Sequence, residues 1–199
     1  MFLRIVSLVV YALATFSSVA GGPTSPVTMA AATAQAAPAG KTAIPGIAAR
    51  PEDVSTIDGI IKAYYEVVSG PAEKPREWGR DATLYMPGIR FIELSEDASG
   101  KVSAHSMSHQ EFVDSFESAL HGKAFYEREV HRITHRAGNA VQVLTTSEHF
   151  TAPGGPVLGH SVDNLQLYWD GTRWWIASDS IWSVERADRP LPAEFLPAK

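Results

Sequence analysis

A carboxyl group on a predicted strand is the strongest candidate for proton transfer in this sequence. Asp163 alternates with Leu165 and Leu167 within the predicted strand 157–169, so the three side chains share one face. A face with two leucines should turn toward the protein interior, where burial raises the pKa of a carboxyl group. Asp163 could then act as a proton donor or base. The alternative is a position at the rim, solvated or paired with an arginine.

Two histidines on successive predicted strands are the next candidates. We expect His131 to share a face with Glu129, and His149 to share a face with Ser147. Neutral imidazoles could exchange protons or bind a metal, but the spacing is not the i, i+4 of a helical zinc site. Exposed strand positions, or positions on a dimer face, are the alternative. We predict no metal and no cofactor.

Composition excludes several classes of protein. The chain has 199 residues, of which 45% are hydrophobic and 20% are charged, as is usual for a globular protein. Its 17 basic and 22 acidic residues give a net charge of −5 without a Lys/Arg block, which argues against a nucleic-acid partner. The lack of cysteine excludes disulfides, thiol catalysis and Cys-based zinc sites.

The N-terminus has the features of a secretory signal peptide. A short basic segment, residues 1–4, precedes the apolar segment 5–16, and residues 18–20 offer a cleavage site between small side chains. The apolar segment is shorter than the roughly 20 residues that span a bilayer. We predict cleavage of residues 1–20 and a periplasmic or secreted bacterial protein without membrane attachment. An uncleaved N-terminal anchor is the alternative.

The rest of the chain divides by composition into a linker, one domain and a tail. Residues 21–51 are mostly Ala, Pro, Gly, Thr and Ser, which predicts a flexible linker. Residues 52–186 carry the periodic apolar pattern of a single α+β domain. Residues 187–199 contain several prolines and are expected to be irregular.

Helices come first in the predicted domain, and strands follow. The apolar spacing over residues 57–68 predicts a helix, and Ser108 with Glu111 forms a capping-box sequence that begins a second helix ending at Gly122. Short turns such as Asp170-Gly171 join the later strands, which predicts a mostly antiparallel meander. The expected strands are residues 82–88, 89–94, 101–104, 125–135, 140–151, 157–169 and 173–185.

Three segments carry a resemblance to a known superfamily. They are residues 60–70, residues 80–88 with the pattern D-A-x-x-x-x-P-G, and residues 162–176. In their order and spacing they resemble the nuclear-transport-factor-2-like superfamily, in particular SnoaL-like domains, over roughly residues 52–185. The resemblance implies a curved sheet wrapped around helices into a cone with a pocket at its open end. That fold hosts isomerases, dehydratases, cyclases, epoxide hydrolases and non-catalytic binders, so it does not fix the function.

The same resemblance suggests roles for individual residues. Asp163 matches the oxyanion-binding Asp of ketosteroid isomerases, and Tyr64 and Tyr65 match the region of their oxyanion Tyr, although core packing is the alternative for both phenols. The general-base Asp of those enzymes falls near Met86. Because methionine cannot accept a proton, we do not expect steroid isomerisation, and we expect Met86 to line an apolar pocket.

Aromatic and apolar residues should complete the pocket. Its expected lining includes Tyr65, Trp78, Met86, Leu165 and Trp182. Other tryptophans should cover the outer face of the sheet, and exposed aromatic surface there would favour a homodimer through that face.

These observations lead to a binding function with an enzymatic alternative. We predict an exported SnoaL-like domain that binds a small apolar organic molecule in its cone pocket without catalysis. The alternative is a cofactor-independent isomerase, dehydratase or cyclase that uses Asp163 with Tyr64, His131 or His149. The long linker also fits a third class, an accessory domain of a larger exported complex.

Overall fold

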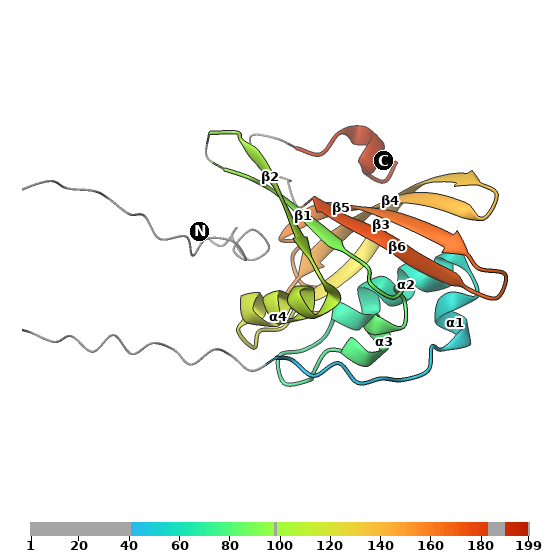
Figure 1. Cartoon of the computed structure of the whole chain (residues 1–199). Coiled ribbons are helices and arrows are strands. Elements are labelled where there is room, and N and C mark those ends of the chain that lie inside the picture. Colours follow the sequence, from blue (N-terminus) through green and yellow to red (C-terminus); the bar gives the residue numbers. More distant parts are fainter. Residues whose placement is uncertain (1–40, 98, 183–189, 199) are drawn as a thin grey trace, which may run out of the picture.

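The structure is a computed structural model that describes residues 41–97, 99–182 and 190–198 (Figure 1). The predicted signal peptide 1–20, the first part of the predicted linker at 21–40, and residues 183–189 lie outside the described residues. Among the described residues, no helix has the length and apolar character that crossing a membrane requires.

A single six-stranded sheet forms one wall of the domain, with the strand order β2-β1-β6-β5-β4-β3. Neighbouring strands are antiparallel except for β1 and β6, which run parallel. The strands are β1 (Phe91–Glu96), β2 (Val102–Met107), β3 (Tyr126–Ala137), β4 (Ala140–Phe150), β5 (Gly159–Trp169) and β6 (Trp174–Trp182). The meander from β3 to β6 was predicted from alternating apolar residues and short turns.

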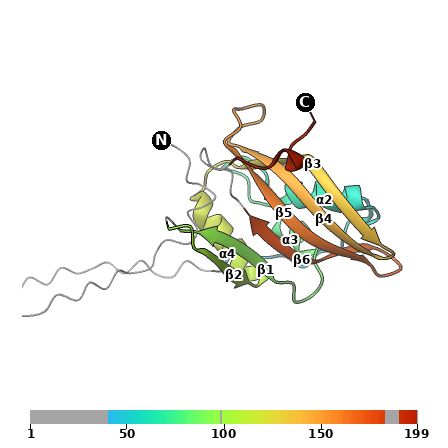
Figure 2. The same cartoon turned by 90° about the horizontal axis from the view of Figure 1, so that it is seen from above.

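The helices lie against one face of this sheet (Figures 1 and 2). They are α1 (Pro51–Val54), α2 (Ile57–Val68), α3 (Trp78–Ala82) and α4 (His109–Leu120), and a 3-10 turn, η1 (Ala193–Phe195), lies near the C-terminus. Helix α2 buries most of its apolar residues, and Thr56 caps its first turn. Helix α4 begins with the predicted capping box, in which Ser108 and Glu111 bond reciprocally.

The sheet curves over α2 and α4, and the core fills the space between them (Figure 2). Fully buried side chains come from both layers, including Ile60 and Ile61 of α2 and Leu165 and Ile176 of the sheet. The predicted α+β class, with a curved and mostly antiparallel sheet around N-terminal helices, is therefore confirmed.

Two β-bulges change which residues face the core. In β3 the pairing moves from Glu129 opposite Ser147 to His131 opposite Thr146, so Val130 is an extra residue. In β6 the pairing moves from Ile176 to Ser178, which leaves Ala177 extra. Because side chains alternate along a strand, each extra residue exchanges the inner and outer positions beyond it.

Residues 41–51 are packed on the domain, in contrast to the predicted flexible linker. The backbone N–H of Thr42 donates to Asp114 of α4 over 2.7 Å, and the side chain of Gln110 donates to the Thr42 carbonyl over 2.9 Å. Ile44 packs against the hydrophobic core. These contacts place residues 41–51 with the domain. The composition of the segment gave no sign of them, because they depend on partners in α4.

The strand expected at residues 82–88 does not form. Helix α3 extends to Ala82, and Tyr85 then makes a single bridge to Ile176 of β6.

At the other end of the chain, η1 is the only regular turn in residues 190–198, and Thr146 of β4 donates a hydrogen bond to the Phe195 carbonyl. The C-terminal segment therefore contacts the outer face of the sheet.

Candidate functional site

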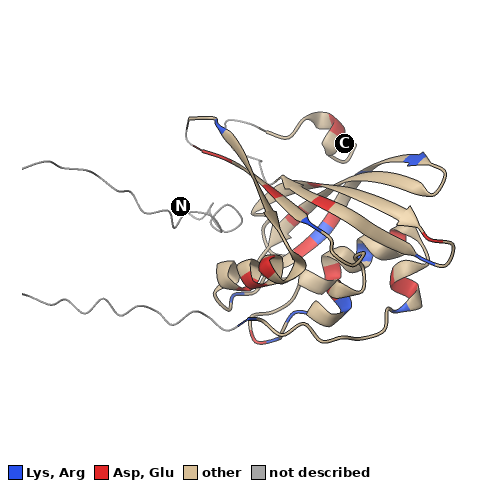
Figure 3. Cartoon of the chain, in the orientation of Figure 1, with Lys and Arg blue, Asp and Glu red and all other residues tan. Residues whose placement is uncertain are grey.

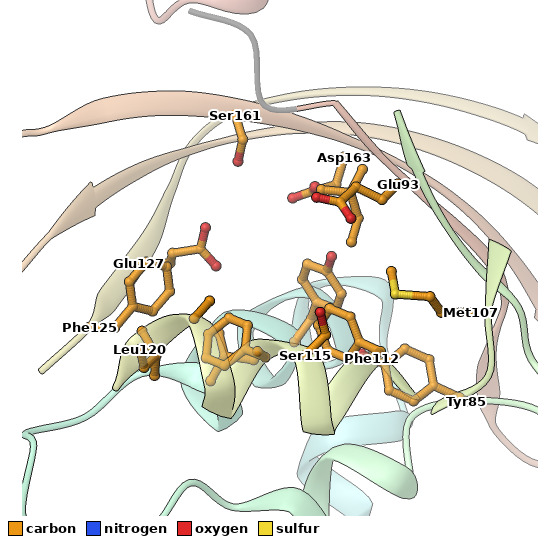
Figure 4. Close-up of a pocket in the computed structure, with 15 residues that line it drawn as sticks. Tyr85, Glu93, Met107, Phe112, Ser115, Leu120, Phe125, Glu127, Ser161 and Asp163 are labelled. Carbon is orange, nitrogen blue, oxygen red and sulfur yellow. The ribbon is translucent and has the colours of Figure 1, made fainter. Parts of the chain in front are cut away.

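Acidic residues, drawn red in Figure 3, occur within the sheet as well as on the helices. Several face a cavity of about 100 Å³ between the sheet and helices α2 and α4. Its apolar lining consists of Val68, Met107, Phe112, Phe116, Ala119, Leu120, Phe125 and Ile181. Figure 4 shows the carboxyl groups of Glu93 and Asp163 on the sheet side of this cavity, opposite Phe112 and Ser115 of α4. We call the sheet side of the cavity, which carries Glu93 and Asp163, its roof; the opposite side, on α4, is mostly apolar.

Asp163 lies in the roof and is 3% exposed, as the alternation with Leu165 predicted. Among the described residues it has one hydrogen-bond partner, the Tyr65 hydroxyl, which is 3.3 Å from its Oδ2. Burial, together with the nearby charges of Asp179 and Glu127, raises the pKa of Asp163 well above its usual range. No arginine pairs with Asp163 in the described part of the chain.

Hydroxyl groups of α2 and β4 link Asp163 to Glu129 of β3. The Tyr65 hydroxyl lies 3.0 Å from the Thr145 hydroxyl, which donates over 2.7 Å to Glu129. Glu129 is in turn held by Arg132 over 2.6 Å. The single Tyr65 proton can be donated to Thr145 or, over the longer distance, to Asp163 Oδ2, and donation to Asp163 opposes the effect of burial on its pKa. Asp163 Oδ1 receives no hydrogen bond from a described residue.

Tyr64 and Asp179 form a second phenol–carboxyl pair behind the roof. The Tyr64 hydroxyl donates to Asp179 Oδ2 over 2.8 Å, while Oδ1 of this fully buried aspartate has no partner among the described residues. Burial raises the pKa of Asp179 to about 7, although the hydrogen bond from Tyr64 acts in the opposite direction. Burial also raises the pKa of the Tyr64 phenol well above its usual value, so Tyr64 stays protonated.

Glu93 extends the roof onto β1. Its Oε2 is buried and has no hydrogen-bond partner in the described part of the chain. Burial raises the pKa of Glu93, and the charge of His105 opposes that effect. In the ladder, Glu93 lies opposite Ile181, which lies opposite Asp163, so the three residues form one row across β1, β6 and β5.

Glu127 and His149 form a polar cluster at the β3 side of the cavity. His149 Nε2 lies 2.9 Å from Glu127 Oε1 and 3.0 Å from the Ser161 hydroxyl. Glu127 and Ser161 line the cavity, whereas His149 lies behind them and is 6% exposed. One ring nitrogen makes both contacts, so the cluster differs from a nucleophile–base–acid triad, in which the two ring nitrogens have different partners.

Of the residues proposed from the sequence, Asp163 and Tyr64 line this cavity. Tyr65 reaches it through its bond to Asp163, and His149 reaches it through Glu127. These four side chains come from α2, β4 and β5, which the topology brings together under the curved sheet.

The remaining proposed residues lie elsewhere. His131 sits opposite Thr146, whose hydroxyl bonds to the C-terminal segment, so the bulge in β3 places His131 on the outer face. Met86 lines a separate, more open cleft near α3. The other three expected lining residues are also absent from the described lining of the cavity: Trp78 and Leu165, which are buried in the core, and Trp182, the neighbour of Ile181.

Sequence analysis missed Asp179, Glu93 and Glu127. A simple alternation from Ile176 would place Ser178 and Ser180 inside, but the bulge in β6 brings Asp179 and Ile181 to the inner face instead. For Glu127, the signal was its position two residues before Glu129, on the same side of β3.

A histidine outside the cavity is also paired with a buried acid. His109 Nε2 lies 2.6 Å from Asp81, which is fully buried and also accepts a hydrogen bond from Tyr85. This pair joins the start of α4 to α3. Among the described residues, no group of three or more acidic or histidine side chains is arranged to hold a metal ion.

Comparisons with known proteins concern the fold alone. The sequence matches no protein-family model and no curated protein. Solved structures similar to it include a protein of unknown function with a cystatin-like fold from Nostoc punctiforme, with 10% identity, a TM-score of 0.45, and coverage of 65% of this chain and 93% of that one. A cystatin-like protein from Caulobacter vibrioides has 16% identity, a TM-score of 0.44, and coverage of 66% and 89%.

A third similar structure is an NTF2-like protein of unknown function from Silicibacter pomeroyi. It has 11% identity and a TM-score of 0.42, and the match covers 65% of this chain and 94% of that one.

Proposed function

We propose that this domain binds a compact, largely apolar organic molecule in the cavity under the curved sheet. The observation that carries the proposal is an apolar cavity with a buried carboxyl group, Asp163, whose only described hydrogen-bond partner is Tyr65. Binding sites of this kind combine apolar walls with a few placed polar groups that orient the ligand.

The size of the cavity limits the ligand. A volume of about 100 Å³ is several times the space that one water requires, and it is smaller than the pocket of a typical drug-sized ligand. Phe116 and Phe125 meet edge to face in its wall, with ring centroids 5.3 Å apart. A molecule with one ring or a short branched chain fits these walls best.

Filling the cavity tests this proposal. Ala119 lines it from α4, so Ala119→Phe should occupy the space while every polar group of the roof is retained. Native mass spectrometry of protein purified from its own host should show a bound small molecule in the wild type and none in Ala119→Phe. The matched control is Ala104→Phe, at an exposed position of β2, and this variant should keep the ligand. Equal occupancy of wild type and Ala119→Phe would place the ligand elsewhere and overturn the proposal.

A second candidate function is acid–base catalysis without a cofactor. It is favoured by two buried aspartates, Asp163 and Asp179, each bonded by a tyrosine of α2. Carboxyl groups whose pKa is raised toward neutrality can exchange protons at physiological pH, and such groups concentrate at active sites. Asp163 would transfer the proton and Tyr64 would orient the ligand.

The ligand recovered from the host distinguishes catalysis from binding. Incubation with the protein in D₂O should produce isotope exchange at carbon, or a product, if Asp163 transfers a proton. Asp163→Asn should stop that reaction, because asparagine cannot transfer the proton. An unchanged ligand after incubation with the wild type would contradict catalysis and leave binding as the function.

Export and assembly remain predictions of the sequence. We propose that residues 1–20 direct export and are removed, which fractionation of the host and the mass of the mature chain would test. The homodimer was predicted from exposed aromatic surface, yet all five tryptophans are buried or half-buried in the structure. Light scattering on the purified protein would measure the oligomeric state directly.

A further inference from the structure

We infer that the cavity selects a small molecule with a protonated amine on an apolar body, and that the amine sits between Glu93 and Asp163. This inference rests on the proposed binding function and specifies the class of ligand. It comes from the direction of the hydrogen bonds in the roof, from the row of residues across the sheet, and from the aromatic walls.

The roof offers acceptors to a ligand. Asp163 Oδ1 receives no hydrogen bond from any described residue, and Glu93 Oε2 is buried without a partner. The two phenols that line the cavity, Tyr64 and Tyr85, already donate to Asp179 and Asp81. A ligand carbonyl could bond only to the protonated form of one of these acids, whereas a ligand with several N–H donors would satisfy both oxygens. A buried polar atom without a partner costs about 1–3 kcal/mol, so the site favours a donor-rich ligand.

The cross-strand row provides a position for an ammonium group. Glu93 and Asp163 flank Ile181 in one row, so their backbones are two strand spacings apart, or about 10 Å. Both side chains line the cavity with Ile181 between them. An ammonium group above Ile181 can therefore reach both carboxyl groups with separate N–H donors, because it carries three.

Charge also favours a cation. Glu93, Glu127 and Asp163 line the cavity, and no lysine or arginine does so within the described residues. His105, the partner of Glu93 on β2, is exposed and is not part of the described lining. His149 is occupied by Glu127 and Ser161. An incoming cation would favour the ionised forms of Asp163 and Glu93, which burial alone disfavours, and the faces of the aromatic side chains would stabilise it further.

Three molecules of similar shape and different charge test the inference: phenethylamine, phenethyl alcohol and phenylacetate. Calorimetric titration at neutral pH should give the amine an affinity at least about tenfold higher than that of the alcohol, because hydrogen bonds to charged groups contribute about 1.5–3 kcal/mol. Phenylacetate should bind more weakly than the alcohol, since its carboxylate would meet acceptors and negative charge.

Two variants locate the amine. Glu93→Gln and Asp163→Asn should each lower the affinity for phenethylamine about tenfold and change the affinity for phenethyl alcohol by less than about threefold. Glu73→Gln, an equal change of charge at an exposed position outside the cavity lining, should leave both affinities unchanged. If both variants bind the amine as the wild type does, the assigned position is wrong.

The outcomes separate this inference from the proposed function. Binding of the alcohol as tightly as the amine would overturn the amine preference and leave a binding cavity for neutral molecules. Preference for phenylacetate would also overturn it and would indicate a cation at the site from outside the described residues. If Ala119→Phe keeps its natural ligand, the proposed function fails, whichever molecule is preferred.

Discussion

Two groups of buried carboxyl groups among the described residues differ in their partners: one is paired with arginine, and the other with tyrosine hydroxyls. Near α3, Arg80 is 8% exposed and bonds Asp53 through two nitrogens at 2.7 and 2.8 Å. Glu66 and Glu77 complete its partners. These carboxylates raise the pKa of Arg80, with the hydrogen bond to Asp53 as the largest cause. Arg50 also pairs with Glu77 and Lys62 with Glu66, so three cations face three carboxylates in this region.

The roof of the cavity has similar side chains and a different balance. Asp163 and Asp179 are as buried as Asp53, but their partners are the neutral hydroxyls of Tyr65 and Tyr64. Burial shifts these two groups toward the protonated form, whereas the hydrogen bond from Arg80 lowers the pKa of Glu77. This difference supports our proposal that the cavity, unlike the Arg80 region, binds a ligand.

Removal of Arg80 should have the largest effect of the variants considered. Arg80→Met leaves Asp53 buried without a partner, so we expect the free energy of unfolding to fall by about 3–5 kcal/mol. Urea unfolding at neutral pH measures this change. The matched control is Arg128→Met, because Arg128 is an exposed partner of Glu148, and its loss should cost less than about 1 kcal/mol. Equal losses in the two variants would show that the Arg80 cluster is not a special stabilising element.

Asp179→Asn should have an intermediate effect that depends on pH. The pKa of Asp179 is raised to about 7 in the folded protein, so between about pH 4 and pH 7 the folded state binds more protons than the unfolded state. Its contribution to stability is therefore present at low pH and is lost as the pH rises through 7. The variant lacks this loss. From low pH to pH 8, the free energy of unfolding of the variant should therefore rise by a few kcal/mol relative to that of the wild type.

Urea unfolding of both proteins from about pH 4 to pH 8 measures this effect, and the difference between them removes the contributions of other acids. Asparagine can still accept the Tyr64 hydrogen bond, so the variant should fold. A constant difference across the whole pH range would mean that Asp179 titrates normally. The contrast between the two buried regions would then be lost.

The regular parts of the fold were predictable because their signals are local. The capping box at Ser108 and Glu111 needs only side chains three residues apart, and the structure contains both of its bonds. The hairpin at Asp170-Gly171 was predicted from residues that tolerate a positive φ, and Gly171 has a φ of 102°. The burial of Asp163 followed from strict alternation in β5, which has no bulge next to it.

The rest of the site depends on features that alternation cannot show. Bulges at Val130 and Ala177 place His131 outside and Asp179 inside, which is the reverse of a continuous count. Glu93 belongs to the site because β1 pairs in parallel with β6, a contact between segments far apart in the sequence. No local pattern reports such a pairing, so the carboxyl groups beyond Asp163 could not be assigned from the sequence.

Removal of a tyrosine hydroxyl should have the smallest effect on stability and a clear effect on titration. Tyr64→Phe removes the donor to Asp179, which should cost about 1 kcal/mol of unfolding free energy. The hydrogen bond lowers the pKa of Asp179 against the effect of burial, so the pKa should rise further in the variant. Carbon-detected NMR titration of the aspartate carboxyl groups measures that shift.

Tyr65→Phe is the matched variant, since the two phenols are neighbours on α2 and contact different aspartates. It should raise the pKa of Asp163, whose only described hydrogen bond comes from Tyr65, and should have a smaller effect on Asp179. A downward shift of the pKa in either variant would mean that the phenol, as an acceptor, had stabilised the neutral acid. The two tyrosines and Arg80 would then shift the pKa of their carboxyl partners in opposite directions, because the phenols would favour the protonated acids and Arg80 favours the ionised ones. The roof would in that case hold its acids in the protonated form more firmly than the geometry of Tyr64 indicates.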